Sequence, residues 1–164
     1  MMMIKDSMVL IHLAKTSLLS TSCDYFGNIL IPNQVKEEVM KGQDDTIIIQ
    51  DMINKGKITV KSIKNKKFIE KAYEFNIQKA EAEAVALYWE TDANLLATDD
   101  YNVRKKREIL NLNIIGTPAI ILKLFEQKRI NRIKFEESIK KMKSIGWFSN
   151  TVWDKIQMEA NKNE

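Results

Sequence analysis

The chain has 164 residues, of which 45% are hydrophobic and 29% are charged, and its net charge is +4. A chain of this size and apolar content can bury one core, so we expect residues 1–164 to form a single domain. The only cysteine, Cys23, excludes an internal disulfide, and with one histidine, His12, the usual ligands of a zinc site are missing. Oxygen atoms must therefore hold any metal ion, and the positive charge favours an anionic partner.

The first residues are apolar, but they do not form a run long enough to cross a membrane. Lys5, Asp6 and His12 interrupt the hydrophobic stretch. No cleavage site of small residues follows it, so we do not predict a signal peptide. We expect a cytoplasmic protein that makes no contact with a membrane.

Short apolar segments alternate with helical patterns in the first half of the chain. A strand is predicted to end near Asp6, followed by a helix over about 8–19 and a Ser/Thr-rich loop that holds Cys23. The elements predicted next are a strand over 29–31, a helix over 32–41, a helix over 44–56 that begins with Asp44 and Asp45, a strand over 57–63, and helices over 67–76 and 78–90.

The second half continues the alternation. A strand over 94–98 leads into Asp99 and Asp100, which begin a helix predicted over 99–111. A strand over 112–116 follows, and Thr117 is predicted to cap the next helix, with Pro118 at its first position. Two more helices are expected over 135–146 and 149–161. This alternation predicts a three-layer α/β/α fold, with a short-stranded parallel sheet covered by helices on both faces.

Acidic residues recur where such a sheet places its ligand sites, at the carboxyl ends of the strands. Two predicted strands lead into aspartates, and two helices carry glutamates beside apolar positions. Glu38 lies next to Val39, and Glu81 shares a face with Val85. The candidate metal-binding and catalytic residues are Asp6, Glu38, Glu81, Asp99 and Asp100, with Glu83 as the alternative third acid.

A cluster of carboxylates indicates a particular chemistry. Like charges raise one another's pKa values, so the cluster needs a cation between its members. Mg²⁺, or Mn²⁺ in its place, suits these ligands, because it accepts a few carboxylates and keeps waters that phosphate oxygens displace. Such an ion activates water and neutralises phosphate charge, which predicts hydrolysis of phosphodiester bonds. For any one of these residues taken alone, helix capping or a place in solvent is the alternative.

Six segments resemble, in order, the sequence blocks of PIN-domain proteins. They are "DSMVLIHLAK", "ILIPNQVKEEV", "AEAEAVAL", "LLATDDYNVR", "IIGTPAIIL" and "GWFSNTVWDKI". Together they cover nearly the whole chain and resemble the branch related to VapC-type toxins of toxin–antitoxin modules. The resemblance implies a PIN-like α/β/α fold and an endoribonuclease that depends on Mg²⁺ or Mn²⁺.

The resemblance also implies roles for individual residues. Asp6 and Glu38 would be the first and second metal ligands. Glu81 would be the third, with Glu83 as its rival, and Asp99 and Asp100 share the fourth place. Arg104 matches a basic residue one helical turn after the acidic pair, and we expect Arg104 and Lys105 to bind the substrate. The implied partners are an RNA substrate, an antitoxin protein that covers the acidic edge, and a second copy in a homodimer.

Three residues depart from the PIN-domain blocks. Met8 stands in place of a small hydroxyl residue that supports the first aspartate, Val9 in place of proline, and Ala80 in place of glycine. Met8 and Ala80 favour the rival hypothesis, a catalytically silent PIN-like module that binds RNA or a protein. A nuclease acting on DNA is a third alternative, because no part of the sequence is seen to recognise a 2′-hydroxyl.

Basic and aromatic residues have both structural and functional explanations. The run 104–107 and the clusters at 64–67 and 127–134 suggest a groove that binds phosphates, whereas the cluster at 140–143 is expected to be a solvated helix face. Trp89, Trp147 and Trp153 lie in apolar helical patterns, so we expect them in the core or in a subunit contact rather than stacked on bases. His12 is expected to be structural.

Overall fold

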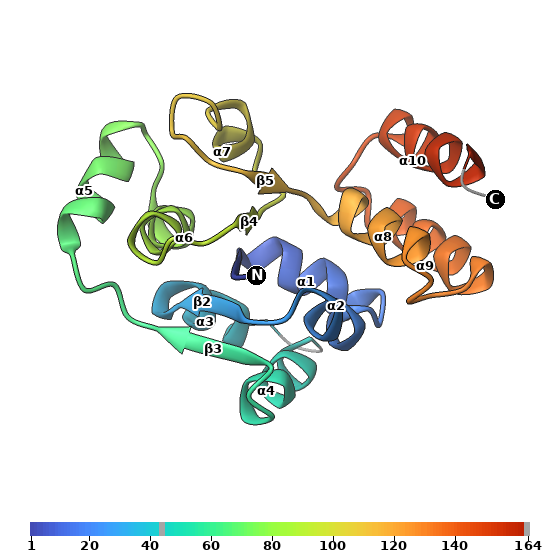
Figure 1. Ribbon diagram of the computed structural model, residues 1–164, viewed down its shortest axis with the longest axis horizontal. Coiled ribbons are helices and arrows are strands. Elements are labelled where there is room, and N and C mark those ends of the chain that lie inside the picture. The colour runs from blue at the N-terminus through green and yellow to red at the C-terminus, as the bar shows by residue number, and fades with distance from the viewer. Residues whose placement is uncertain (43–44, 163–164) are drawn as a thin grey trace.

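The structure is a computed structural model that describes residues 1–42 and 45–162. In Figure 1 the strands run through the middle of the molecule, with α5 and α6 on one side and α8 to α10 on the other. The strands are β1 (Met3–Lys5), β2 (Ile29–Pro32), β3 (Ile58–Lys61), β4 (Leu95–Ala97) and β5 (Ile114–Ile115). The helices are α1 (Ser7–Lys15), α2 (Leu19–Phe26), α3 (Asn33–Met40), α4 (Thr46–Asn54), α5 (Lys66–Glu74), α6 (Lys79–Glu90), α7 (Tyr101–Lys105), α8 (Thr117–Glu126), α9 (Arg132–Ile145) and α10 (Asn150–Lys162).

The five strands form one parallel sheet in the order β3-β2-β1-β4-β5. β1 lies at its centre, where Met3 pairs with Ile29 of β2 and with Leu95 of β4. Parallel strands all end at the same edge of a sheet, so the residues directly after β1 and β4 are neighbours in space. This confirms the predicted α/β class and the predicted parallel sheet.

Helices cover both faces of the sheet. α6 packs on β1, β2 and β4 and contacts α3 and α5. On the other face α2 packs against α1 and α8, and α10 packs on α8. The central strand is fully buried between these layers, with Met3 and Ile4 0% exposed. Burial on both faces explains why the strands are short, continuous apolar runs. None of the helices in the described part of the chain is both long and apolar enough to cross a membrane.

The helix predicted over 8–19 is wrong at its end. α1 stops at Lys15, and Ser17 takes a left-handed conformation with φ of 58° before a second helix, α2, begins. The hydroxyl of Thr16 donates to the carbonyls of His12 and Leu13, which competes with continuation of the helix. Cys23, which was placed in a loop, is therefore buried in α2.

The polar composition of α2 concealed its helical pattern. Leu19, Ser22, Cys23 and Phe26 are all buried, and their spacing is that of one helix face. Ser20, Thr21 and Ser22 are small hydroxyl residues, which are weak helix formers and more often indicate a loop. In the helix predicted over 44–56, Asp44 lies outside the described residues, and α4 begins at Thr46.

Two details of the second half also differ from the prediction. α7 covers only Tyr101–Lys105, and after a turn the chain returns so that Leu110 is buried. Trp89 fixes that return by donating its indole N–H to the carbonyl of Leu110 at 3.0 Å. Gly116, and not Thr117, is the N-cap of α8, because the Thr117 hydroxyl is bonded elsewhere.

A lysine lies fully buried at the end of the central strand. Lys5 is 0% exposed, and its Nζ donates to Sδ of Met3 at 3.1 Å and lies 5.2 Å from the centre of the Phe26 ring. No carboxylate of the described residues forms an ion pair with it. Burial lowers the pKa of Lys5 from the usual 10.5 to about 8.

We expect Lys5→Met to stabilise the protein by roughly 2–3 kcal/mol at pH 7, because it removes a charge buried without a carboxylate. In the native protein the unfolded chain binds the Lys5 proton more tightly than the folded state between pH 8 and 10.5. The free energy of unfolding should therefore rise with pH across that window, and this rise should disappear in Lys5→Met. Urea unfolding at several pH values measures both effects. Lys61→Met, at an exposed lysine, is the control and should change neither. A less stable Lys5→Met protein at pH 7 would contradict the interpretation.

Candidate functional site

Asp6 joins the central strand to α1 at the carboxyl edge of the sheet. Its Oδ1 accepts the backbone N–H of Ser7 at 2.7 Å, which caps α1, and its Oδ2 accepts the hydroxyl of Thr98 at 2.9 Å. The side chain is nearly buried, since the residue is 3% exposed. Burial, together with the charges of Glu81 and Asp100, raises the pKa of Asp6 to about 7. Asp6 therefore lies in a negative potential that a cation would relieve.

Two glutamates on α3 and α6 belong to the same electrostatic group. Burial raises the pKa of Glu81, and the charges of Glu38 and Asp100 raise it further. Glu38 is half-buried, whereas its neighbour Glu37 is exposed. The helical projection of the sequence had directed Glu38 inward, and the structure places it on the side of α3 that interacts with Glu81.

Glu83 has a different environment from Glu81. Its Oε1 accepts the backbone N–H of Gln34 at 3.2 Å, in the first turn of α3. The N-cap of that helix is Pro32, whose side chain cannot accept a hydrogen bond. Glu83 therefore caps a neighbouring helix, while the electrostatic interactions of Glu81 are with Asp6, Glu38 and Asp100.

Asp99 and Asp100 follow β4, but they point to different surroundings. Asp100 is half-buried and lines a hollow with Glu81, Lys79 and Asn102. Its Oδ1 accepts the backbone N–H of Val103 at 2.8 Å, which caps α7. This leaves the second oxygen without a hydrogen-bond donor among the residues that the structure describes.

The carboxylate of Asp99 is enclosed by hydrogen-bond donors. Oδ1 accepts the backbone N–H of Thr117 at 2.7 Å, and Oδ2 accepts the Thr117 hydroxyl and Nδ1 of His12, the latter at 2.8 Å. The side chains of His12 and Asp99 are both 0% exposed. This network ties the end of β4 to α1 and to the start of α8.

The two predicted substrate-binding residues lie on α7, beyond the acidic pair. Arg104 is half-buried, and its Nη1 donates to the carbonyl of Thr98 at 3.3 Å. It lines a pocket with Asp99, not the hollow that holds Asp100. Lys105 is exposed, with its Nζ 5.5 Å from the centre of the Tyr101 ring. Of the two, Arg104 therefore has the more fixed position.

The carboxylates at the sheet edge fit a hard divalent cation. They offer oxygen only, and within residues 1–42 and 45–162 none of Asp6, Glu38, Glu81 and Asp100 forms an ion pair with a basic side chain. No three histidine, cysteine, aspartate or glutamate side chains of the described residues are placed to hold a metal ion as they stand. Mg²⁺ is usually held by one or two carboxylates together with waters, so it does not require a finished cage.

Sequence reasoning missed several residues that shape this edge. Thr98 donates to Asp6 and accepts the backbone N–H of Asp100 at 3.1 Å, so one hydroxyl joins both aspartates. Thr98 thus provides the hydroxyl group that supports the first aspartate, which the PIN-domain resemblance led us to expect at the position of Met8. A threonine between a strand and an acidic pair was the available signal. Trp147 is 47% exposed, so it does not lie in the core, and the other expectation, a subunit contact, stays a prediction.

Comparison with known proteins agrees with this architecture. Residues 2–162 match the DUF3368 family, which is described as a PIN domain. No curated protein and no solved structure matched the chain. The match spans almost all of the sequence and includes every element of the parallel sheet and all residues of its acidic edge. The chain therefore belongs to this family of PIN domains, which are generally nucleases.

Proposed function

We propose that the protein is a metal-dependent ribonuclease that hydrolyses phosphodiester bonds at the acidic edge of its sheet. The observation that carries the proposal is the meeting of Asp6, Glu81 and Asp100, three carboxylates from separate parts of the chain. The Thr98 hydroxyl is hydrogen-bonded to both Asp6 and the backbone of Asp100, and Glu81 lines one hollow with Asp100. The parallel sheet brings the residues after its strands together, but nothing in its packing requires them to be acidic, and the repulsion between their charges costs stability. A cation that bridges them would turn this repulsion into binding energy.

Each residue of the edge has a part in this proposal. Asp6 and Asp100 would hold Mg²⁺ or Mn²⁺ from the strand ends, and Glu38 and Glu81 would do so from the two helices. The bound ion would supply Lewis-acid activation of a water and neutralise charge at the phosphate. Thr98 keeps the two aspartates oriented through its hydroxyl, and Asp99 holds the end of β4 in place. Arg104 and Lys105 would attract the RNA backbone.

The biological setting is a further part of the proposal and rests on the resemblance of the sequence blocks alone. The protein would be a VapC-like toxin of a toxin–antitoxin module, acting in the cytoplasm. An antitoxin would silence it by covering the acidic edge. A homodimer would be the active form.

Thermal melting with Mn²⁺ tests the cation site directly. At a Mn²⁺ concentration about 100 times the dissociation constant, we expect the melting temperature to rise by roughly 5–10 °C. The rise should be larger at pH 8 than at pH 6, because Asp6, with its pKa near 7, must lose its proton before it binds the ion.

Two matched variants separate metal binding from helix capping. Glu81→Gln should reduce the Mn²⁺-dependent rise in melting temperature. Glu83→Gln should keep that rise and lower the melting temperature slightly in the absence of metal, because it weakens the cap on α3. No response of the native protein to millimolar Mn²⁺ would refute the metal site and favour the catalytically silent module.

A further inference from the structure

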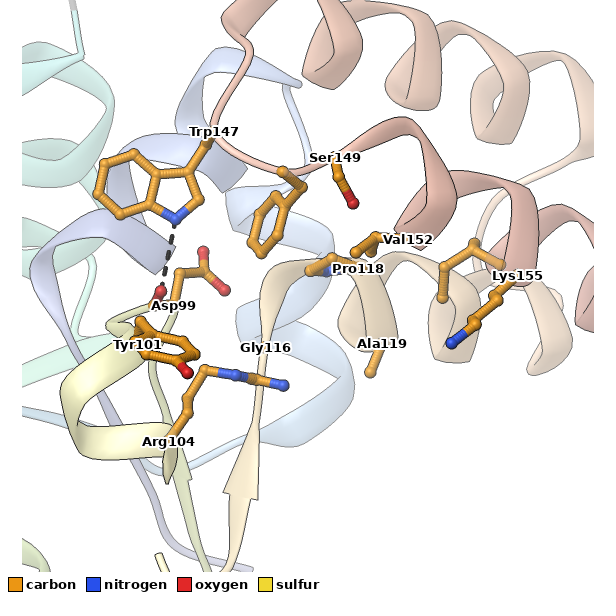
Figure 2. Close-up of a pocket in the computed structure, with 12 residues that line it drawn as sticks. Asp99, Tyr101, Arg104, Gly116, Pro118, Ala119, Trp147, Ser149, Val152 and Lys155 are labelled. Carbon is orange, nitrogen blue, oxygen red and sulfur yellow. Dashed lines mark hydrogen bonds between the residues drawn. The ribbon is translucent and has the colours of Figure 1, made fainter. Parts of the chain in front are cut away.

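A pocket of about 470 Å³ lies beside the acidic edge, between α7, the start of α8 and α10. Its volume falls in the range of roughly 300–1,000 Å³ that is usual for small-molecule sites. In Figure 2, Trp147, Tyr101 and Arg104 lie on one side of it, and Val152 and Lys155 on the other. The residues that line it are Asp99, Tyr101, Arg104, Gly116, Pro118, Ala119, Trp147, Phe148, Ser149, Val152, Lys155 and Ile156.

The charges of the pocket favour an anionic ligand. Among the described residues that line it, the basic side chains are Arg104 and Lys155 and the only acidic one is Asp99. Both oxygens of that carboxylate are already bonded to Thr117 and His12, and the side chain is 0% exposed, so the accessible charge of the pocket comes from the two basic residues. Arg104 and Lys155 form no ion pair with any carboxylate of the described residues.

Arg104 is held at the pocket by close packing rather than by an acid. Nη1 donates to the carbonyl of Thr98 at 3.3 Å. A Cβ atom added at Gly116 would lie 2.6 Å from the same nitrogen, so only glycine leaves room for the guanidinium there. The rest of the guanidinium has donors in a fixed plane, a geometry that suits phosphate oxygens.

Two aromatic rings of the pocket are exposed, and one of them is anchored. Trp147 is 47% exposed, although its indole N–H donates to the carbonyl of Asp99 at 3.4 Å and its ring meets His12 edge to face at 5.4 Å. Tyr101 is 77% exposed at the start of α7. The Trp147 ring, partly open and anchored at one edge, presents a flat face on which a base can stack at little entropic cost, and the exposed Tyr101 ring offers a second face.

The pocket adjoins the proposed catalytic edge through three consecutive residues. Asp99 and Tyr101 line the pocket, while Asp100 between them lines the hollow that holds Glu81. Consecutive Cα atoms lie about 3.8 Å apart, so one ligand can reach both places. A chain of nucleotides offers what the two sites together require, a flat base and neighbouring phosphates.

We infer that this pocket receives an unpaired base of the RNA substrate, with Arg104 on an adjacent phosphate. The inference rests on the proposed function and narrows its substrate class, because only a single-stranded or extruded nucleotide can place its base there. Trp147 and Tyr101 would provide the stacking faces, and Lys155 would lie near a phosphate farther along the strand.

Binding of fluorescently labelled RNA in EDTA tests the inference without cleavage. The probes are a single-stranded octanucleotide and the same octanucleotide with abasic sugars at its centre, and fluorescence anisotropy reports the dissociation constants. We expect the native protein to bind the intact probe about tenfold more tightly, which is typical of one stacked base. Trp147→Ala and Tyr101→Ala should each reduce the difference between the dissociation constants of the two probes. Trp147→Phe should preserve the difference, because it keeps an aromatic face.

Further variants test the contribution of charge to RNA binding and control for loss of folding. Arg104→Ala should weaken the binding of both probes by the same factor and make that binding less dependent on salt. Lys140→Ala, at an exposed lysine of α9, should have a much smaller effect on the affinity. Ile133→Ala is the control for loss of an exposed apolar side chain, and it should leave the preference unchanged. Tyr101 is largely exposed, so Tyr101→Ala remains informative even where Trp147→Ala disturbs the fold.

Equal affinity of the native protein for intact and abasic RNA would overturn the inference. Unchanged RNA affinity in Trp147→Ala and Tyr101→Ala would do the same and would point to a protein segment as the occupant. Because these measurements contain no metal, they are independent of the nuclease proposal. If the protein distinguishes the two probes but cleaves no RNA, only the nuclease proposal is wrong. If it cleaves RNA but binds both probes equally, only the base pocket is wrong.

Discussion

Replacement of Asp6 by asparagine is expected to lower RNA cleavage by a factor on the order of 10²–10³, the usual cost of losing one electrostatic partner in an active site. Asp6 lies at the centre of the acidic edge, and its pKa is raised to about 7 by burial and by the charges of Glu81 and Asp100. An amide at this position cannot donate negative charge to a cation. Cleavage of a labelled single-stranded RNA in Mg²⁺ or Mn²⁺ measures the loss.

Asp6→Asn should retain the fold. Its amide oxygen can still accept the backbone N–H of Ser7, and its amide nitrogen can donate to the hydroxyl of Thr98, which rotates to accept. The melting temperature without metal should stay level or rise, because a buried carboxylate with like-charged neighbours is removed. Asp92→Asn, at an exposed aspartate, is the matched control and should cleave normally. Undiminished cleavage by Asp6→Asn would refute the proposed site.

The parallel sheet was predictable because its signals are local. Short apolar runs such as Ile29–Pro32 and Leu95–Ala97 are bounded by helical patterns, and only a sheet buried on both faces produces that alternation. The acidic edge could be derived in the same way, because parallel strands bring the residues after their carboxyl ends to one place. The placement of Asp6 and of the pair Asp99 and Asp100 at one edge thus came from the ends of two predicted strands, without any knowledge of contacts.

The division of tasks within the site depends on tertiary contacts, which no local pattern shows. Asp99 and Asp100 are chemically identical neighbours, and only the approach of His12 and Thr117 from other elements separates them. Glu81 and Glu83 differ in the same way, because Gln34 of another helix bonds to one of them. The helical projection of the sequence favoured Glu81 over Glu83, but the sequence offered no basis for choosing between Asp99 and Asp100.

The base pocket was missed for a related reason. Trp147 lies in an apolar pattern that favours burial, yet Gly146 ends α9 in a left-handed conformation and the chain turns there. That turn carries the indole to the edge of the sheet, where its N–H reaches the carbonyl of Asp99. A residue's exposure at such a turn depends on the path of the backbone and not on the residues around it.

Paired alanine variants of Asp99 and Asp100 should have opposite consequences. Asp99→Ala is expected to lower the free energy of unfolding by about 3–5 kcal/mol, because it leaves the backbone N–H and hydroxyl of Thr117 and the ring of His12 buried without their acceptor. Asp100→Ala should cost only about 1 kcal/mol, the usual value of a helix cap. Urea unfolding without metal measures both.

When metal is added, Asp100→Ala should show the larger defect of the two variants. Asp100→Ala should lose most of the Mn²⁺-dependent rise in melting temperature and most of the RNA cleavage. Asp99→Ala, assayed at a temperature where it is folded, should keep the response to Mn²⁺. Thr117→Val removes one donor to Asp99 and should reproduce part of the instability without affecting the metal. If Asp99→Ala instead remained stable and lost the Mn²⁺ response while Asp100→Ala kept it, Asp99 would be the ligand. The hydrogen bonds from Thr117 and His12 would then serve to orient a metal-binding oxygen rather than to secure the strand.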